Sequence, residues 1–320
     1  METQTQGSHT PASLLVIGLG GTISLALENG RASATDNLGE ILARSGHSAA
    51  HVQVDTISLR TKDSTDLTVE DLMEAARLIQ SKAGHYDGFI LTTGTDTLEE
   101  VAYGLHYLLG SSAPVIVTGA MRPPYMDDYD GVTNLEDAVT ACQAMPPQEG
   151  GVFAAIGNHL FSAAHAFKQD ATRLDGFIST SPDHPPQRIV AGMAVTASPA
   201  RAAPRMDHLE DVPTVDLVNV SLGCRWPHDP KHLPAGLVIS CPGAHSLPTA
   251  LLEDLKPMLD AKRPVILASR CISFTPSSQS FYPGYAAFLE DKGLEIAAYA
   301  GLTPQKARLK LIFRLMGLAG

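Results

Sequence analysis

The sequence contains few cysteines, and this scarcity argues against two kinds of structural support. Its 320 residues include four cysteines, which are far apart and form no CxxC pair: Cys142, Cys224, Cys241 and Cys271. A disulfide framework and a structural zinc site are therefore not expected. The cysteines are predicted to be small, buried apolar side chains.

Positive charge is also scarce, which restricts the possible partners. The chain has 23 Lys and Arg against 34 Asp and Glu, so its net charge is −11. A protein that binds nucleic acid needs a basic surface for the phosphates, and a helix that lies on a membrane needs a basic amphipathic face. We therefore expect neither nucleic acid nor a membrane among the partners.

The first residues lack the pattern of a secretory signal. The opening segment, METQTQGSHTPAS, has no basic stretch followed by an apolar run. The first apolar run, at 14–27, is too short and too rich in glycine to span a bilayer. These observations predict a cytoplasmic protein.

Hydrophobic residues are plentiful by comparison, at 44 % of the chain, which is enough for a large core. Short apolar runs typical of buried strands alternate with segments of helical spacing, in the order 14–17, 69–79, 88–91, 96–109 and 114–117. Thr68 is expected to open the first helical segment. The alternation predicts an α/β fold of two domains, a larger N-terminal domain with a mostly parallel sheet flanked by helices and a smaller C-terminal α/β domain.

A proline-rich stretch at 182–213 interrupts the alternation and is expected to be a crossover with an isolated hairpin at 188–196. Strands and helices then resume at 215–220, 236–240, 249–259, 264–269 and 303–317, the last being a helix with Pro304 in its first turn. The predicted limits are a flexible N-terminus at 1–12, an N-terminal catalytic domain at 13–190, a linker at 191–213 and a C-terminal domain at 214–320.

Three of the predicted strands end in small or hydroxyl-bearing residues: GGT at 20–22, TGTD at 93–96 and TGA at 118–120. In open parallel sheets, ligands bind outside the carboxyl ends of the strands. We therefore expect the functional site at this edge of the sheet.

The first of these turns leaves three interpretations open. The segment GLGGTI at 18–23 matches the dinucleotide-binding pattern poorly, because its sixth position is Ile23 and no acidic residue ends a second strand at the usual distance. The turn is a tight turn without a ligand, a phosphate loop, or a turn that presents Thr22 as a nucleophile.

The second turn also has a structural and a chemical interpretation. Thr95 or Asp96 could cap a helix, with Glu99 or Glu100 completing a capping box. The same hydroxyls and carboxylate could instead form a catalytic cluster. A threonine hydroxyl is a weak nucleophile that needs a base, and a desolvated lysine serves better than an aspartate.

The chain resembles the bacterial-type L-asparaginases, which include the glutaminase-asparaginases. The resemblance runs from residue 14 to the C-terminus and rests on blocks in the family's order: GGTI at 20–23, GTDTLEE at 94–100, GAMRP at 119–123, DG at 130–131, NL at 134–135 and PQKAR at 304–308. It implies hydrolysis of L-asparagine to L-aspartate and ammonia, without metal, nucleotide or flavin. L-glutamine or another small amide as the substrate, and a non-catalytic amino-acid binder on the same fold, stay as alternatives.

The resemblance also assigns catalytic roles. Thr22 corresponds to the nucleophile that forms a β-acyl-enzyme, on a turn that begins a mobile lid, and Thr95, Lys168 and Asp96 correspond to the assisting triad. Lys168 can act as a base only if it is buried, whereas without the resemblance it would be an ordinary exposed lysine. The backbone N–H groups of Thr95 and Ala120 are the implied oxyanion donors.

The implied substrate-binding residues are Ser64, Thr65, Gly94, Ala120 and Ser246. Ser64 and Thr65 lie in DSTDLT at 63–68, in which Asp63, Ser64 and Asp66 could alternatively only cap the next helix. Ser246 stands where the family has an asparagine from a partner subunit. Two further departures are Thr93, where the family often has histidine, and the lack of tyrosine between Thr22 and Asp55. A shared site of this kind implies a homodimer or homotetramer.

Overall fold

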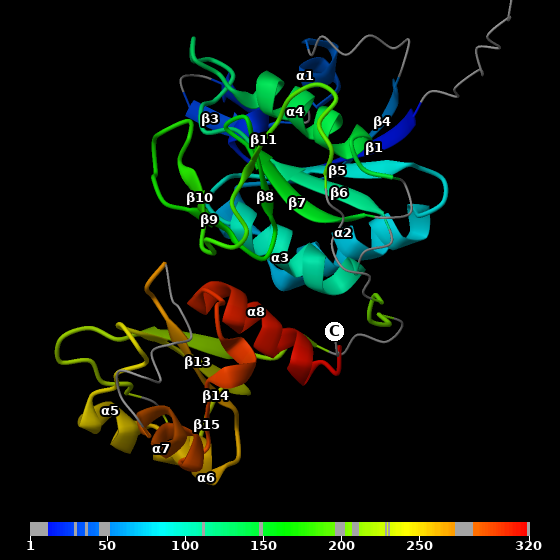
Figure 1. Cartoon of the computed structure of the whole chain (residues 1–320). Helices are drawn as coiled ribbons and strands as arrows, with labels where there is room; N and C mark the ends of the chain where they lie inside the picture. The colour runs from blue at the N-terminus through cyan, green and yellow to red at the C-terminus, as the bar shows by residue number, and fades with distance from the viewer. Residues whose placement is uncertain are drawn as a thin grey trace, which may run out of the picture.

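Two separate sheets, one mostly parallel and one parallel, organise the computed structural model of the chain (Figure 1). The structure describes residues 12–28, 31–35, 38–44, 52–110, 113–146, 150–195, 202–206, 211–227, 229, 231–272 and 284–318. Of the predicted flexible segment 1–12, all but Ala12 lies outside these ranges, and Ala12 is the first residue of β1.

The main sheet has seven strands in the order β11-β8-β7-β6-β5-β1-β4. Five are mutually parallel: β1 (Ala12–Gly20), β4 (Val52–Lys62), β5 (Gly88–Thr92), β6 (Pro114–Thr118) and β7 (Gly151–Ile156). Strand β8 (His159–Ser162) pairs antiparallel with β7, and the edge strand β11 (Gln187–Arg188) pairs antiparallel with β8. Strands β5, β6 and β7 are buried throughout, which explains their continuous apolar runs.

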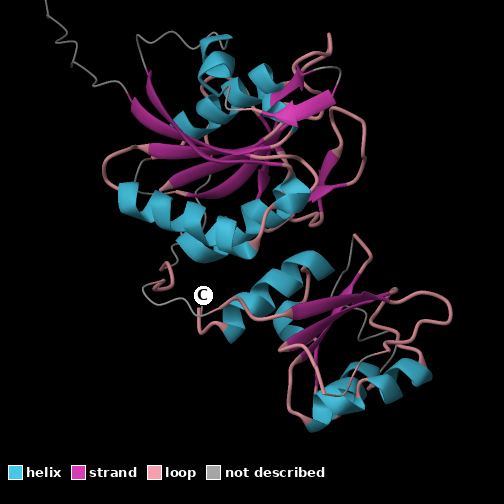
Figure 2. Ribbon diagram, turned by 180° about the vertical axis from the view of Figure 1, so that it is seen from behind, coloured by secondary structure: helices cyan, strands magenta, loops and turns pink. Residues whose placement is uncertain are grey.

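Helices cover both faces of the main sheet (Figure 2). One face packs α2 (Val69–Lys82) and α3 (Leu98–Leu109), and the other packs α1 (Leu38–Arg44) and α4 (Gly131–Gln143). Alternate residues of β1 point to opposite faces, so Leu15 and Ile17 join the first core while Leu14 and Val16 join the second. The predicted α/β fold class, with a mostly parallel sheet flanked by helices, is confirmed.

Thr68 opens α2 as predicted. Its hydroxyl accepts the N–H of Asp71, and the Asp71 carboxylate accepts the N–H of Thr68, so the two residues form a capping box. The Asp71 carboxylate also accepts hydrogen bonds from Arg60 and Lys62 at the end of β4. The start of α2 is thereby fixed to the strand that precedes it.

The second sheet contains four parallel strands in chain order: β12 (Val215–Asn219), β13 (Gly236–Cys241), β14 (Val265–Ser269) and β15 (Leu294–Glu295). On one face lie α5 (Thr249–Asp254), α6 (Lys256–Asp260) and α7 (Tyr285–Asp291), and on the other lies α8 (Pro304–Leu315). Pro304 stands in the first turn of α8, as predicted, with Thr303 as its N-cap.

The last helix joins the two units. Leu309, Ile312 and Phe313 of α8 belong to the same core as α3 and one face of the main sheet. The Phe313 ring stacks on Tyr107 with 5.1 Å between centroids, and the Tyr107 hydroxyl donates to the Leu318 carbonyl at 2.9 Å. The domain limits at residues 190 and 214 stay a prediction.

Three local predictions are wrong. Segment 249–259 forms two short helices rather than one, because Pro257 has no N–H to continue α5. No isolated hairpin occurs within the described part of 188–196, since Arg188 pairs instead with His159 at the edge of the main sheet, while Thr196 is outside the described residues. Cys271 is exposed because it follows the end of β14, and Cys224 is only partly buried.

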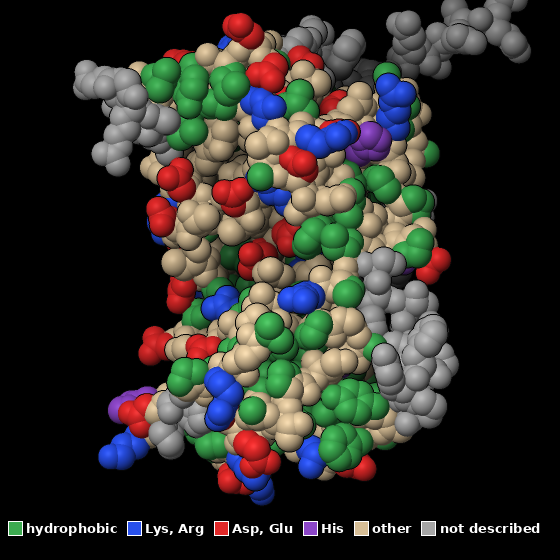
Figure 3. All heavy atoms as spheres, turned by 90° about the vertical axis from the view of Figure 1, so that its left-hand side faces the viewer, with side chains coloured by type: hydrophobic (Ala, Val, Ile, Leu, Met, Phe, Trp, Pro, Cys, Tyr) green, Lys and Arg blue, Asp and Glu red, His purple; other side chains and the backbone are tan. Residues whose placement is uncertain are grey.

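Two smaller sheets lie near the main one, a hairpin of β2 (Leu25–Glu28) with β3 (Arg31–Ala34) and a pair of β9 (Ala166–Lys168) with β10 (Phe177–Ser179). Acidic and basic side chains are interspersed over the face of both units seen in Figure 3. Within the described ranges, no helix combines the length and hydrophobicity that a membrane crossing requires.

Candidate active site

The carboxyl ends of β1, β4 and β5 lie close together at one edge of the main sheet, and two glycines allow this close approach. A Cβ atom at Gly21 would lie 2.1 Å from the backbone nitrogen of Gly94, and one at Gly94 would lie 2.8 Å from the side chain of Ser64. Gly21 also has φ +85°, a conformation that favours glycine. The Gly21 N–H donates to the Lys62 carbonyl at 3.0 Å. Only residues without side chains allow the three segments to approach this closely.

Thr22 is partly buried and begins the short 3-10 helix Thr22–Ser24 that follows β1. Tyr129 holds the next residue, because its hydroxyl donates to the Ile23 carbonyl at 2.8 Å. Burial raises the pKa of Tyr129 far above its usual value, so the hydroxyl remains a donor. The β2–β3 hairpin follows directly, and the prediction that a mobile lid begins here stays untested.

Lys168 connects the next two predicted residues. Its ammonium donates to the hydroxyl of Thr95 at 2.8 Å and to the carboxylate of Asp96 at 2.7 Å. The Lys168 side chain is only 14 % exposed, so the interpretation as an ordinary exposed lysine is wrong. Asp96 is 66 % exposed and reaches solvent, whereas Thr95 is buried.

The capping interpretation of this turn is wrong. The N-cap of α3 is Thr97, whose hydroxyl donates to the Ser64 carbonyl at 2.8 Å instead of capping the helix. Thr95 and Asp96 precede this N-cap, and both accept hydrogen bonds from Lys168. Glu99 does not complete a capping box either, because its carboxylate accepts the backbone N–H of Lys168 at 2.7 Å.

Ser64 and Thr65 lie on the short 3-10 helix Ser64–Asp66 between β4 and α2. Ser64 is buried against Gly94 and Thr65 is exposed. The alternative that segment 63–66 only caps the next helix is wrong, since Thr68 is the N-cap of α2. These two residues therefore lie at the same sheet edge as Thr95.

A loop after β6 brings Ala120 to this edge. A Cβ atom at the preceding Gly119 would lie 2.4 Å from the Thr93 carbonyl and 3.3 Å from the Thr95 side chain. The Asp130 carboxylate accepts the N–H groups of Met121 and Arg122, and the Asn134 amide donates to the carbonyl of Gly119 and the carboxylate of Asp130. The sequence blocks at 130–131 and 134–135 thus hold the loop that carries Ala120.

Thr93 is fully buried, and its hydroxyl has no hydrogen-bond partner among the described residues. Its backbone N–H donates to the Thr118 carbonyl at 2.9 Å, which aligns the ends of β5 and β6. Thr93 therefore contributes to this edge through its backbone N–H and not through its hydroxyl.

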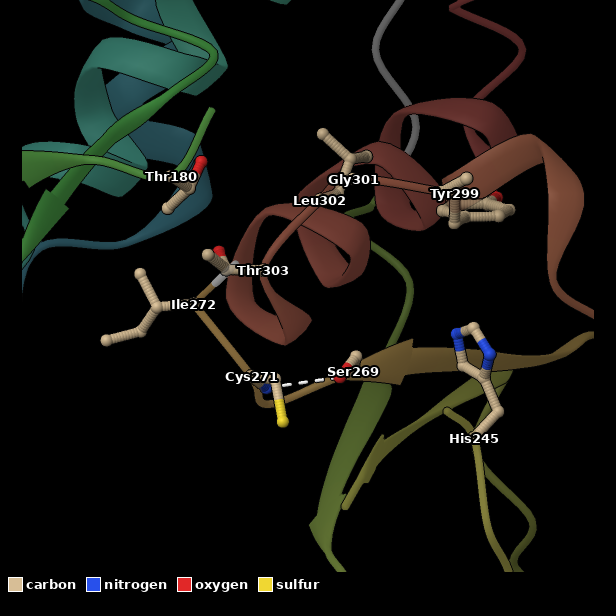
Figure 4. Close-up of a pocket in the computed structure, with 10 residues that line it drawn as sticks. Thr180, His245, Ser269, Cys271, Ile272, Tyr299, Gly301, Leu302 and Thr303 are labelled. Atoms are coloured by element: carbon tan, nitrogen blue, oxygen red, sulfur yellow. Dashed lines mark hydrogen bonds between the residues drawn. The ribbon is translucent and has the colours of Figure 1, made fainter. Parts of the chain in front are cut away.

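Ser246 is the one predicted site residue in the C-terminal unit, where it follows β13 and is exposed. Across the described ranges, no hydrogen bond joins it to the residues around Gly94. A separate hollow lies nearby, lined by His245, Ser269, Cys271, Thr180 and the segment 299–303 (Figure 4). None of the predicted site residues lines it.

Three contributors at the main edge were not predicted from the sequence. No local pattern marks Tyr129, the spacing of Glu99 indicates a capping box instead, and Asp130 belongs to a family block without an assigned role. In the described part of the chain, no three side chains of His, Cys, Asp or Glu are grouped to hold a metal ion.

The sequence and the fold of the chain can be compared with known proteins. A family model described as "Asparaginase, N-terminal" matches residues 13–201. An L-asparaginase from Bacillus licheniformis is 36 % identical over 167 residues, a match that spans 51 % of each chain. A probable L-asparaginase from Deinococcus radiodurans is 32 % identical over 260 residues, or 79 % of this chain and 78 % of that protein. The crystal structure of a probable cytoplasmic L-asparaginase from Campylobacter jejuni is similar with a TM-score of 0.76 and 25 % identity, over 95 % of both chains.

Proposed function

The chain belongs to the asparaginase family, and on that premise we propose that it hydrolyses the side-chain amide of L-asparagine to L-aspartate and ammonia. The observation that carries the proposal is the position of the Lys168 ammonium, which donates to both Thr95 and Asp96 at the sheet edge. A lysine shared between a hydroxyl and a carboxylate at the carboxyl ends of the strands supplies the groups for acid–base catalysis.

In the first half of the proposed reaction, the Thr22 hydroxyl attacks the amide carbon of the substrate. The new bond between the Thr22 oxygen and this carbon replaces the bond to nitrogen, and ammonia leaves with the transferred proton. The backbone N–H groups of Thr95 and Ala120 stabilise the charge on the carbonyl oxygen. Donors of this kind typically contribute a factor of about 10²–10³ to the rate.

In the second half, water cleaves the β-acyl ester on Thr22 and L-aspartate leaves. The Thr95–Lys168–Asp96 set orients this water and relays its proton. Lys168 is suited to this role because it is largely shielded from solvent and held between two oxygen atoms. The first half converts the Thr22 hydroxyl into an ester and the second half regenerates it, so the enzyme returns to its starting state.

The substrate's charged end is proposed to lie across Ser64, Thr65 and Gly94, with the exposed Asp96 carboxylate holding the α-ammonium group. Ser64 is buried beside Gly94, and Thr65 and Asp96 are exposed. L-glutamine carries the same charged end on a side chain one methylene longer. Discrimination by one methylene amounts to only about 10–200-fold, so L-glutamine belongs in every assay.

A shared site in a homodimer or homotetramer completes the proposal. Ser246 lies in the C-terminal unit and is exposed, so it is available to a neighbouring subunit rather than to its own strand ends. Light scattering of the purified protein measures the number of subunits. The Campylobacter jejuni neighbour is described as cytoplasmic, and we propose the same location here, which cell fractionation tests.

The decisive measurement is ammonia release from L-asparagine and L-glutamine by the wild type and by the folded variants Thr22→Ala and Thr95→Ala. We expect release by the wild type and its loss in both variants. Wild-type rates in either variant would contradict its assigned role. Calorimetric binding of L-aspartate without turnover of any amide would favour an amino-acid binder.

A further inference from the structure

Lys306 is a buried cation to which the proposed chemistry gives no role. It lies in the first turn of α8, within the block PQKAR at 304–308, and its exposed fraction is 0 %. A buried ammonium group is costly unless it is paired or hydrogen-bonded. The Lys306 ammonium donates to the carbonyl of Ala164 at 3.0 Å and to the carbonyl of Ala166 at 2.5 Å.

Both carbonyls belong to the segment that carries Lys168. Ala164 lies in the turn after β8, and Ala166 is the first residue of β9, two positions before Lys168. On the other side, the backbone N–H of Lys168 donates to the carboxylate of Glu99 in the first turn of α3. Strand β9 is therefore held by a cation from the C-terminal unit and by an anion from the N-terminal unit.

The two buried charges also depend on each other. Burial raises the pKa of Glu99, and the charge of Lys306 opposes this rise. Burial lowers the pKa of Lys306 to about 8, and Glu99 and Glu100 oppose this fall. Removing one partner leaves the other as an uncompensated charge in the interior.

We propose that Lys306 is a positioning residue for the amidohydrolase site, which holds the carbonyls of Ala164 and Ala166 so that the ammonium of Lys168 stays on Thr95 and Asp96. This inference rests on the proposed function and gives the C-terminal helix a part in it. Lys306 acts through Lys168 and not on the substrate. A substitution of Lys306 therefore changes turnover and not substrate binding.

The first test compares Lys306→Met with Lys310→Met. Methionine keeps the length of the side chain without its N–H donors. Lys310 is a matched control, because it lies one turn further along α8 and donates to Ala298 within the C-terminal unit. We expect Lys306→Met to lower kcat for L-asparagine by about 10–100-fold, since misplacement by 1 Å can cost a factor of this size. KM is expected to stay within about twofold, and Lys310→Met to leave both constants within about twofold.

A double-mutant cycle separates positioning from a general structural role. In a Lys168→Met background, adding Lys306→Met is expected to change the residual kcat by less than about twofold, because the residue through which it acts is gone. A loss of the full size in that background would overturn the proposal. An unchanged kcat of Lys306→Met in the presence of Lys168 would overturn it as well.

Hydrogen exchange provides a measurement that does not depend on activity. We expect faster amide exchange in the peptide 160–170 of Lys306→Met and no change there in Lys310→Met. Unchanged exchange in Lys306→Met would overturn the proposal. If the wild type releases no ammonia while exchange responds as expected, the proposed function fails and the anchoring of β9 by Lys306 stands.

A second variant covers the case in which Lys306→Met does not fold. Adding Glu99→Gln removes the unpaired buried charge and keeps an oxygen that can accept the N–H of Lys168. The double variant is expected to fold and still to lose about 10-fold or more in kcat, because Ala164 and Ala166 lack their donor. Wild-type kcat in this folded double variant would overturn the proposal.

Discussion

The two large sheets of this chain carry different side chains at the carboxyl ends of their strands. At the main sheet, a largely buried lysine lies between the hydroxyl of Thr95 and the carboxylate of Asp96. At the second sheet, the hydroxyl of Ser269 at the end of β14 donates to the Gly243 carbonyl, and Ser246 is exposed. Both edges are places where a ligand can bind. Only the first has, among the described residues, a lysine placed for acid–base chemistry.

The largest expected effect is on kcat, in a comparison of one cationic residue from each edge. Lys168→Met is expected to lower kcat for L-asparagine by about 10³-fold, because it removes a proton-transferring group. Arg270 follows β14 and donates to the Val220 carbonyl, and Arg270→Met is expected to stay within about threefold. Steady-state ammonia release measures both. Equal losses in the two variants would show that the edges do not differ in function.

A second comparison uses two glycines with positive φ. Gly21 has φ +85° and packs on the backbone of Gly94, whereas Gly243 has φ +51° with nothing within 4 Å of a Cβ atom. Gly21→Ala is expected to lower the free energy of unfolding by about 3 kcal/mol, from backbone strain plus overpacking. Gly243→Ala is expected to lower it by about 1 kcal/mol, from strain alone. Urea denaturation measures both values, and similar losses would contradict the packing argument.

A third comparison uses two tyrosine hydroxyls. The Tyr129 hydroxyl donates to Ile23 beside Thr22, whereas the Tyr285 hydroxyl accepts the N–H of Leu247 beside Ser246 at 3.3 Å. Tyr129→Phe is expected to reduce kcat/KM by about 5–10-fold, the equivalent of one hydrogen bond of about 1 kcal/mol. Tyr285→Phe is expected to stay within about twofold. A larger loss in the Tyr285 variant would assign the stronger positioning role to the second edge.

The last comparison concerns the dependence of stability on pH. Burial lowers the pKa of His165 to about 4, with contributions from His184, whose ring stacks on it at 4.5 Å, and from Lys306. Because the unfolded chain takes up this proton at about pH 6.5, the free energy of unfolding falls as the pH drops from about 6.5 to about 4. Partial exposure limits the expected loss to about 1–2 kcal/mol.

The control for this prediction is His232→Gln, an exposed histidine of the second unit whose ring contacts Asp229. His165→Gln is expected to flatten the dependence of unfolding free energy on pH, and His232→Gln to leave it unchanged. Urea denaturation at pH 7 and pH 5 distinguishes the two. The same pH dependence in His165→Gln and the wild type would exclude His165 as its source.

The sequence predicts much of the main sheet because its signals are local. The apolar runs at 88–91 and 114–117 became β5 and β6, and Thr68 opened α2, since strand burial and capping depend on neighbouring residues. The helical spacing of 249–259 does not reveal the break between α5 and α6, although Pro257 marks it. The isolated hairpin at 188–196 was wrong because Arg188 pairs with a strand about 30 residues earlier, a choice that no local pattern reveals.

The candidate site shows the same limit. The sequence blocks led to Thr95, Asp96 and Lys168, which the structure joins by hydrogen bonds, while their catalytic roles remain predictions. The contacts of Glu99 and Lys306 could not be predicted, because they join residues 69 and 140 positions apart. Such contacts depend on how helices pack on distant strands, and residue spacing contains no information about that packing.

The placement of α8 has a consequence for how the protein is made. Synthesis makes α8 after every other helix and strand described here, yet its residues Ile312 and Phe313 belong to the core that also contains α3. Until they emerge, the apolar side of α3, including Tyr107, has no cover from α8, and Lys306 is not available to hold β9. The nascent chain therefore completes its candidate site only after α8 has emerged, and chaperones have an apolar surface to protect until then.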